Sequence, residues 1–250
     1  MNFIRVSTLF QRECMRFLRV YNQTILSPII NALIFYLIFT VAFAGRTKGF
    51  DGVSYNAIVA TGLVAMSALQ AAYFNTQSTI SIARMLGFIK DYTIAPLTMP
   101  EVFLAMIGAS VVRAFCVGFV TFVALSFFVE FASYNIMASL MYMLLGIILF
   151  ATIGVVVGFI SQDFDKAHAY TSYIVTPLTM LSGTFYSAES LPMPWRNIVL
   201  YNPVFHIIDG FRSGLIGGGS SSWVEFAVLV ILLIAFCFLA VRFLKKGLED

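Results

Sequence analysis

Charged residues are scarce in this sequence. Asp, Glu, Lys and Arg together make up 11% of the 250 residues, whereas a soluble domain of this length carries about a quarter. Hydrophobic residues make up 60%, and the mean hydropathy is +0.92. So few polar side chains cannot cover the surface of a water-soluble globule. The composition therefore excludes a soluble domain and predicts an all-α integral membrane protein.

Cysteine and the common motifs of enzymes are also lacking. The three cysteines, Cys14, Cys116 and Cys237, lie within or beside apolar stretches without paired spacing, so we interpret them as packing residues. The sequence has no HExxH motif, no Cys/His zinc pattern and no nucleophile elbow. It therefore predicts no catalytic, metal or cofactor site in this chain.

Among the missing motifs, the P-loop is the most informative. The stretch "GLIGGGSSSW" is rich in glycine but has no lysine, and no G-x-x-x-x-G-K-[S/T] motif occurs elsewhere. Because that motif holds the phosphates of ATP, the chain is not expected to bind ATP in the P-loop manner. If ATP and Mg drive the protein, a separate ATPase polypeptide must use them. The net charge of +3 is small, and we expect no nucleic-acid partner.

What the sequence does have is long hydrophobic runs, within one predicted domain over residues 1–250. Six of them are long enough to cross about 30 Å of hydrocarbon as helices at 1.5 Å per residue. The fifth carries Pro177 near its middle, which a membrane helix tolerates when a neighbour satisfies the freed carbonyl. The predicted spans cover residues 25–44, 56–79, 102–129, 137–160, 168–186 and 223–243.

The Lys and Arg residues between the spans predict the orientation. With the N-terminus inside, ten of them fall in cytoplasmic segments, and four fall outside: Arg46, Lys48, Arg196 and Arg212. The positive-inside rule therefore places both termini in the cytoplasm, which agrees with six crossings. The run "AFAGRTKGF" after the first span could pass for a cleavage site, but the upstream arginines and the later spans predict an anchor instead.

Residues 1–23 predict an amphipathic helix before the first span. At 100° per residue, one side of it carries Arg5, Arg12, Arg16 and Arg19. Nearly the opposite side carries Phe3, Phe10, Phe17 and Tyr21. We expect this helix to lie in the cytoplasmic interface, with its arginines facing anionic headgroups or an adjacent protein.

Two further features fall in or near the third span. The preceding cytoplasmic loop, "SIARMLGFIKDYTIAPLTMPE", mixes charged and apolar residues and predicts a helix of about two turns that ends at the prolines. Either docking of a soluble partner or a second interfacial helix explains it. Inside the span, Arg113 needs a partner, because a central arginine costs at least about 2.5–3.5 kcal/mol. The candidates are polar side chains of the second span or the carboxylates Glu101, Asp163 and Asp165.

The segment between the fifth and sixth predicted spans is too apolar for an ordinary external loop and too interrupted to cross. It predicts two short re-entrant or interfacial helices, around residues 193–200 and 204–215. Asn202 before Pro203 marks the start of the second, and the glycines at 217–219 mark its end. At membrane depth, we expect its polar side chains to satisfy one another and loose backbone ends: His206, Asp209 and Arg212.

Hydrolase chemistry at that segment is disfavoured. His206, Asp209 and Ser213 could nominally supply a base, an orienting group and a nucleophile. However, they lie on one short helix, where side chains point outward and do not converge on a reacting atom. We therefore predict a structural role for them.

Taken in order, these features resemble the ABC-2-type permease subunits of ATP-driven exporters. The resemblance rests on the basic N-terminal helix, the loop "ARMLGFIKDYTIAPLTMP", and the stretch "TPLTMLSGTFYSAESLPMPW" leading into "YNPVFHIIDGFRSGL". The last two are similar to the C-terminal signature of the family: a Gly-Thr-Phe segment, a Leu-Pro…Trp and an Asn-Pro…Asp-x-x-Arg. The similarity covers essentially the whole chain. It is strongest to small bacterial members grouped with polysaccharide, lipo-oligosaccharide and drug exporters.

The resemblance implies a homodimer in the bacterial cytoplasmic (inner) membrane, bound to two copies of a separate ABC ATPase. It implies that residues 82–94 form a coupling helix that contacts the ATPase through Arg84, Phe88, Lys90 and Asp91. The substrate pathway would run at the dimer interface, lined chiefly by spans one, two and five. The candidate lining residues are Gln70, Tyr73, Asn75, Gln77, Tyr170, Tyr173 and Thr176. The external re-entrant helices would close it through Asn202, Pro203, His206, Asp209 and Arg212. This chain would be a transport subunit and not an enzyme.

Two alternatives stand beside this interpretation. An ATP-independent secondary transporter or channel is disfavoured because spans 1–3 and 4–6 show no obvious inverted repeat and the span centres lack acidic residues. An intramembrane enzyme would need a nucleophile or an acid and base on different spans. For the substrate, the sequence leaves a glycan, a lipid and a drug open.

Overall fold

The computed structural model describes residues 3–43, 53–87, 98–131, 134–161, 163–217 and 222–249. No β-strand lies among these residues, so the prediction of an all-α fold is confirmed for them. Five helical segments are long and apolar enough to cross a membrane, and each overlaps a predicted span. They are η1–α2 (Asn22–Ala42), α3 (Tyr55–Met85), α5 (Met99–Ser126), α6 (Ile136–Ile160) and the Trp223–Lys246 part of α11 (Trp223–Glu249).

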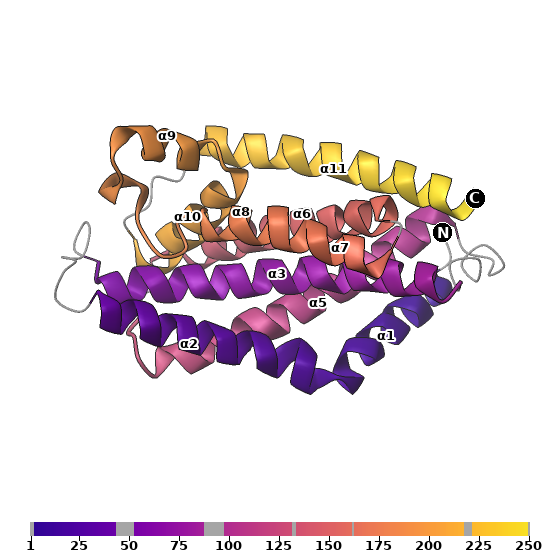
Figure 1. Ribbon diagram of the computed structural model, residues 1–250, viewed down its shortest axis with the longest axis horizontal. Helices are drawn as coiled ribbons and strands as arrows, with labels where there is room; N and C mark the ends of the chain where they lie inside the picture. The colour runs from indigo at the N-terminus through magenta and orange to yellow at the C-terminus, as the bar shows by residue number, and fades with distance from the viewer. Residues whose placement is uncertain are drawn as a thin grey trace.

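The long helices lie roughly along one common axis (Figure 1). The two ends of the chain lie at the same end of the molecule, together with α1 (Phe3–Arg19). The short helices α9 (Met193–Leu200) and α10 (Pro203–Ile216) lie at the opposite end. This arrangement separates the basic N-terminal helix from the Asn202–Arg212 segment by the length of the bundle.

Helix α3 is the centre of the bundle. In its most apolar stretch, 89% of the residues are buried within the protein, compared with 17% for η1–α2 and 11% for α11. It contacts α2, α5, α6, α7 and α10. The helix begins at Ser54, whose side chain accepts a hydrogen bond from the backbone N–H of Ala57 at 3.3 Å. Because α3 is surrounded by protein, it can carry polar residues that a lipid-facing helix could not.

Helices α3 and α6 approach each other at two glycines of α6, four residues apart. A methyl group added at Gly154 would lie 2.2 Å from the Thr76 hydroxyl and 2.4 Å from the Tyr73 carbonyl oxygen. One added at Gly158 would lie 2.9 Å from the side chain of Ile80. In the same contact, Thr76 donates a hydrogen bond to the carbonyl oxygen of Ala151 at 2.7 Å. The sequence "GVVVG" is the small-residue spacing that permits such close packing in membranes.

The predicted fifth span is a shorter, broken helix. It consists of α7 (Phe164–Tyr170), the π-helical turn η3 (Thr171–Val175) and α8 (Thr176–Met180), which follow one another directly. Pro177 lies in the first turn of α8, immediately after the π-turn, a usual way to accommodate a proline in a long helix. Its last helix ends at Met180, whereas the predicted span continued to residue 186. Only five helices of the described part of the chain are long enough to cross by themselves, so a count of six would require this broken helix to cross as well.

Helix α1 meets α2 (Ser27–Ala42) at the π-turn η1 (Asn22–Leu26), and Figure 1 shows the two helices inclined to each other there. The Thr24 hydroxyl donates to the Phe17 carbonyl oxygen at 2.8 Å and fixes this bend. The predicted amphipathic helix is present, but its aromatic residues divide. Phe17 is buried in the protein, whereas Phe3 and Tyr21 are exposed. Helix α1 is thus partly an element of the core.

Helix α10 begins and ends where the sequence predicts. The Asn202 side chain accepts a hydrogen bond from the N–H of Val204 at 3.0 Å, and Pro203 occupies the first turn. Gly217, with a φ of +73°, ends the helix. Near the start of α6, Ser139 donates to the Phe211 carbonyl oxygen at 2.9 Å, so α10 is held against α6.

Candidate functional site

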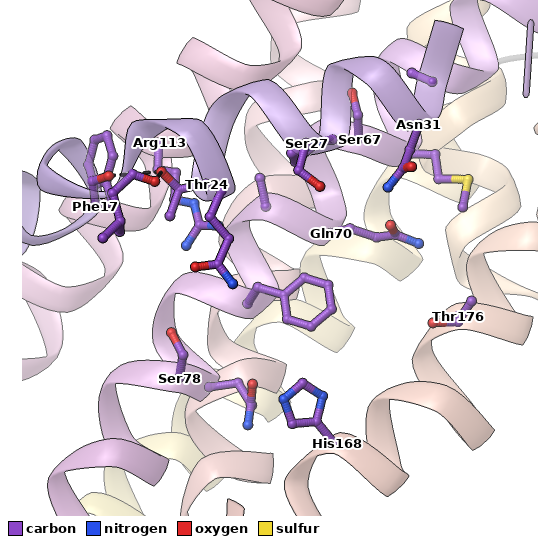
Figure 2. Close-up of a pocket in the computed structure, with 18 of the residues that line it drawn as sticks. Phe17, Thr24, Ser27, Asn31, Ser67, Gln70, Ser78, Arg113, His168 and Thr176 are labelled. Carbon is purple, nitrogen blue, oxygen red and sulfur yellow. Dashed lines mark hydrogen bonds between the residues drawn. The ribbon is translucent and has the colours of Figure 1, made fainter. Parts of the chain in front are cut away.

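A cavity of about 630 Å³ lies between the N-terminal elements (α1, η1 and α2), helices α3 and α5, and the broken helix α7–α8. Figure 2 shows side chains from these helices pointing into it. Its polar lining residues are Arg16, Gln23, Thr24, Ser27, Asn31, Ser67, Gln70, Gln77, Ser78, Arg113, His168 and Thr176. These mostly neutral hydrogen-bonding groups suit a binding cavity, in which a few polar groups orient a ligand among apolar walls.

Three of the seven residues predicted to line a pathway line this cavity: Gln70, Gln77 and Thr176. The Gln70 amide donates to the Thr179 hydroxyl at 3.0 Å, and the Gln77 amide donates to Ser81 at 3.2 Å. The cavity therefore lies against the polar half of α3, facing α8.

The other four predicted lining residues do not line the cavity. Tyr73 is fully buried, and its hydroxyl lies 3.0 Å from the Thr171 hydroxyl, where it joins α3 to η3. Asn75 is also buried and donates to Ser110 of α5 at 2.9 Å. Tyr170 and Tyr173 are exposed on the broken helix. A tyrosine at helical spacing thus packs as readily as it lines a cavity, and sequence spacing does not distinguish the two.

A buried carboxylate, Glu13, organises the N-terminal side of the cavity. It is 2% exposed, and its oxygens lie 3.0 Å from Arg12 Nη2 and 3.1 Å from Arg16 Nε. Arg16 in turn donates to the Asn75 carbonyl oxygen at 3.1 Å and to the Thr79 hydroxyl. The prediction that all four arginines of this helix face headgroups or a partner is therefore wrong for Arg16, which turns inward to α3. One sequence feature could have indicated this inward contact: Glu13 is the single acidic residue of an otherwise basic helix.

Burial also affects a thiol on α1. Burial, with smaller contributions from the Glu13 carboxylate and from Cys116, raises the pKa of the Cys14 thiol. Cys14 should therefore be an inert thiol at neutral pH.

Arg113 of α5 is the least satisfied charge at the cavity. It is 8% exposed, its Nε is buried without a hydrogen-bond partner, and its charged neighbour is Arg16. The three predicted carboxylate partners are wrong. Glu101 accepts from the N–H of Thr98 at 2.8 Å in a capping box, Asp163 pairs with Lys166 at 3.5 Å, and Asp165 is exposed.

At the opposite end of the bundle, Arg212 joins α10 to the end of the broken helix. It is 3% exposed and donates to the Gly183 carbonyl oxygen at 2.6 Å. Its Nη2 and Nε lie 3.5 Å from the Ile58 carbonyl oxygen and the Thr61 hydroxyl of α3. The Asn202 amide donates to the Leu178 carbonyl oxygen at 2.9 Å. The Asn-Pro…Asp-x-x-Arg segment thus satisfies carbonyls that the broken helix leaves free.

His206, Asp209 and Arg212 were predicted to satisfy one another and loose backbone ends. The backbone part is confirmed by the contacts of Arg212 with Gly183 and of His206 with Leu200, and the mutual part is only partly correct. Arg212 Nη1 lies 3.9 Å from Asp209 Oδ1, a long ion pair. His206 points elsewhere: its Nε2 lies 2.8 Å from the Leu200 carbonyl oxygen, and its Nδ1 lies 3.4 Å from Glu225 of α11. The spacing of three residues places the side chains along the helix, but α11 supplies a closer acid to His206. Ser213 donates to the Gly210 carbonyl oxygen of its own helix at 2.9 Å.

Of the predicted ATPase-contacting residues, Arg84 lies at the end of α3, and Phe88, Lys90 and Asp91 lie outside the described residues. Arg84 donates to the carbonyl oxygens of Phe159 and, at 3.1 Å, of Ser161. It therefore fixes the end of α3 to the end of α6 and is not freely available for a partner.

Comparison with known proteins identifies the class. Residues 5–216 match the family described as ABC-2 type transporter, and the chain belongs to this membrane family of transport permeases. The chain is 28% identical over 246 residues to the inner membrane transport permease YadH of Escherichia coli, which covers 98% of this chain and 96% of that protein. Nodulation protein J of Rhizobium meliloti is 26% identical over 214 residues, covering 83% and 80%. Nodulation protein J of Rhizobium leguminosarum bv. viciae is 28% identical over 173 residues, covering 67% and 65%.

Proposed function

We propose that this chain is the membrane-spanning permease subunit of an ABC exporter, that two copies form the substrate pathway, and that a separate ATPase drives it. Membership of the ABC-2 transporter family supports the transport role. The observation that carries the proposal is the cavity between α2, α3 and α7–α8, lined by Gln70, Gln77 and Thr176. These helices are the ones expected to line the pathway.

We propose six crossings with both termini in the cytoplasm. Five of them are made by the long helices. The remaining one, fifth along the chain, is the broken helix α7–η3–α8, extended by the non-helical residues that follow Met180. Non-helical backbone is tolerated at membrane depth only where protein satisfies it. The hydrogen bonds of Asn202 to Leu178 and of Arg212 to Gly183 supply that support.

The homodimer places the exposed sides of α2 and of the broken helix against a second copy. Both helices border the cavity, and both expose large apolar side chains, such as Leu37 and Ile38 on α2 and Tyr173 and Ile174 on η3. A second copy at this side would close the cavity laterally and turn it into a route between subunits.

Coupling to the ATPase is assigned to residues 82–94, at the end of α3. The Arg84 contacts with Phe159 and Ser161 support this assignment, because they join α3 to α6 at that end. A displacement there would move both central helices together. Closure of two ATPase subunits would then bias the bundle toward an arrangement open to the outside. The segment from Asn202 to Arg212 would act as the external gate, since it is anchored to the broken helix.

Purification tests the proposal. The chain is given an affinity tag and is co-expressed with its genomic neighbours, among which the proposal expects an ABC ATPase. We expect the ATPase to co-purify in equal numbers with the permease and to hydrolyse ATP in liposomes. A purified chain that transports with no ATP-hydrolysing companion would instead establish the secondary transporter or channel.

A further inference from the structure

The cavity has a positive end and no internal counter-charge. Among the described residues that line it, the ionisable ones are Arg16, His168 and Arg113, and none is an Asp or a Glu. Arg16 is neutralised by Glu13, which lies behind it at 3.1 Å. No acid of the described part of the chain lies beside Arg113 in this way, and its buried Nε has no hydrogen-bond partner there. A guanidinium in a largely apolar cavity without a counter-ion attracts an anion from outside the chain.

The positions of these side chains define one end of the cavity. Figure 2 shows Arg113 reaching in from α5 beside Thr24 and Phe17, with Ser78 at the same end. His168 points toward the cavity from the broken helix on the other side. The guanidinium and imidazole groups are donors that bind phosphate-type oxyanions, with Arg able to bind two oxygens at once. The hydroxyls of Thr24 and Ser78 already donate to the carbonyl oxygens of Phe17 and Asn75, so they add polarity to this end and not free donors.

The other end of the cavity has more apolar walls, although Asn31, Ser67 and Gln70 also line it. Along α3, the lining runs from Leu63 and Met66 at one end to Ser78 and Ile82 at the other. At 1.5 Å per residue this is about 28 Å, close to the thickness of the hydrocarbon core. Phe35 of α2 also lines the cavity, as does Met180 of α8. The cavity thus extends along α3 from a cationic end to an end with more apolar walls.

We propose that this cavity binds an amphiphile with an anionic, phosphate-type head, in which Arg113 holds the head and the more apolar end holds the hydrocarbon part. That this amphiphile is the transported substrate rests on the proposed transport function. It assigns Arg113 a binding role in place of a structural one. Binding itself needs neither ATP nor the ATPase, so it is tested separately from transport.

The test is equilibrium binding to the purified full chain in a neutral detergent. The probes are dihexanoyl phosphatidic acid, dihexanoyl phosphatidylcholine and inorganic phosphate. We expect phosphatidic acid to bind at least about tenfold more tightly than either of the others, because one charge-assisted contact contributes about that factor. Equal binding of phosphatidic acid and phosphatidylcholine would overturn the proposal. Inorganic phosphate that binds as tightly as phosphatidic acid would overturn the assignment to an amphiphile.

Two variants assign the effect to Arg113. Arg113→Gln should remove the preference for phosphatidic acid, and Arg113→Lys should retain part of it. Arg19→Gln, which removes an exposed arginine of α1, is the matched control and should keep the preference. If Arg113→Gln fails to fold, Ser78→Asp places a carboxylate in the same cavity, keeps Arg113 and should abolish the preference. Folded variants at both positions with an unchanged preference would overturn the proposal. The ATPase co-purification above is unaffected by either outcome, so the two failures are distinguishable.

Discussion

Arg212 donates a hydrogen bond of 2.6 Å to the carbonyl oxygen of Gly183, twenty-nine residues earlier in the chain. Gly183 has a φ of +74°, a conformation that favours glycine, and it follows directly on the end of the broken helix. Thr184, the next residue, lies directly against α3: a methyl group added at Gly62 of α3 would lie 2.1 Å from the Thr184 carbonyl oxygen. The Gly-Thr-Phe and Asp-x-x-Arg parts of the C-terminal signature therefore form one structural unit against α3.

Arg212→Ala should destabilise the protein strongly. It removes the donor to the Gly183 carbonyl oxygen and the long ion pair with Asp209. Truncating one partner of a buried charge pair costs about 3 kcal/mol. The melting temperature of the detergent-solubilised protein should fall by roughly 10 °C. The control is Arg196→Ala on α9, which should change it by less than about 3 °C. Similar melting temperatures for the two variants would contradict the anchoring role.

Glu13→Ala should loosen α1 from the bundle. The variant leaves the half-buried Arg16 beside Arg113 without its acid, and it removes the contact of Glu13 with the Thr79 hydroxyl of α3. Limited trypsin digestion should then cut at arginines of α1 several times faster than in the unmodified protein. Glu189→Ala removes an exposed acid at the other end of the molecule and serves as the control. An unchanged digestion rate for Glu13→Ala would show that Glu13 does not hold α1 against the bundle.

Much of this fold could be predicted from the sequence, because it depends on local signals. Hydrophobic length predicted the five long helices, and the Asn202–Pro203 pair predicted the start of α10. The "GVVVG" spacing indicates a close helix contact on α6, but not that α3 is the helix it meets. Each of these signals lies within a single helix.

The contacts of the candidate site depend on which helices become neighbours, and that is why they were missed or predicted wrongly. His206 was expected beside Asp209 three residues away, but Glu225 of α11 lies nearer in space. The carbonyl oxygen of Gly183 is a partner that no side-chain pattern reveals. Arg113 was expected to have either a carboxylate or a polar side chain of the second span as its partner, and its surroundings supply no carboxylate among the described residues.

Gly154→Ala should disrupt the contact between α3 and α6. The added methyl group would lie 2.2 Å from the Thr76 hydroxyl and 2.4 Å from backbone that cannot move aside, so we expect a loss of about 1–3 kcal/mol. Thermal unfolding followed by size-exclusion chromatography measures this loss. Gly118→Ala on α5 is the control, because its methyl group would meet only the Ala68 side chain, at 3.1 Å. Equal stability of the two alanine variants would refute the close approach.

Lys90→Ala with Asp91→Ala should uncouple ATP hydrolysis from export and leave the permease folded. These charges belong to the segment assigned to ATPase docking, so their removal should weaken binding of the ATPase and lower transport at least about tenfold. The matched control is Asp163→Ala with Lys166→Ala, which removes one acid and one base from an exposed pair. Transport at the unmodified rate in the Lys90 and Asp91 double variant would refute the docking assignment.

The central claim is that the broken helix crosses the membrane and brings the number of crossings to six. The end of α3 and the start of the broken helix then lie on the cytoplasmic side, and α9 lies outside. Three exposed positions report on it in a background with Cys14, Cys116 and Cys237 replaced by serine: Leu86→Cys, Lys166→Cys and Met193→Cys. A membrane-impermeant maleimide is added to intact cells and to inside-out vesicles. The account predicts that position 193 reacts only in cells, and that positions 86 and 166 react only in inside-out vesicles. Reaction of positions 166 and 193 from the same side would contradict it.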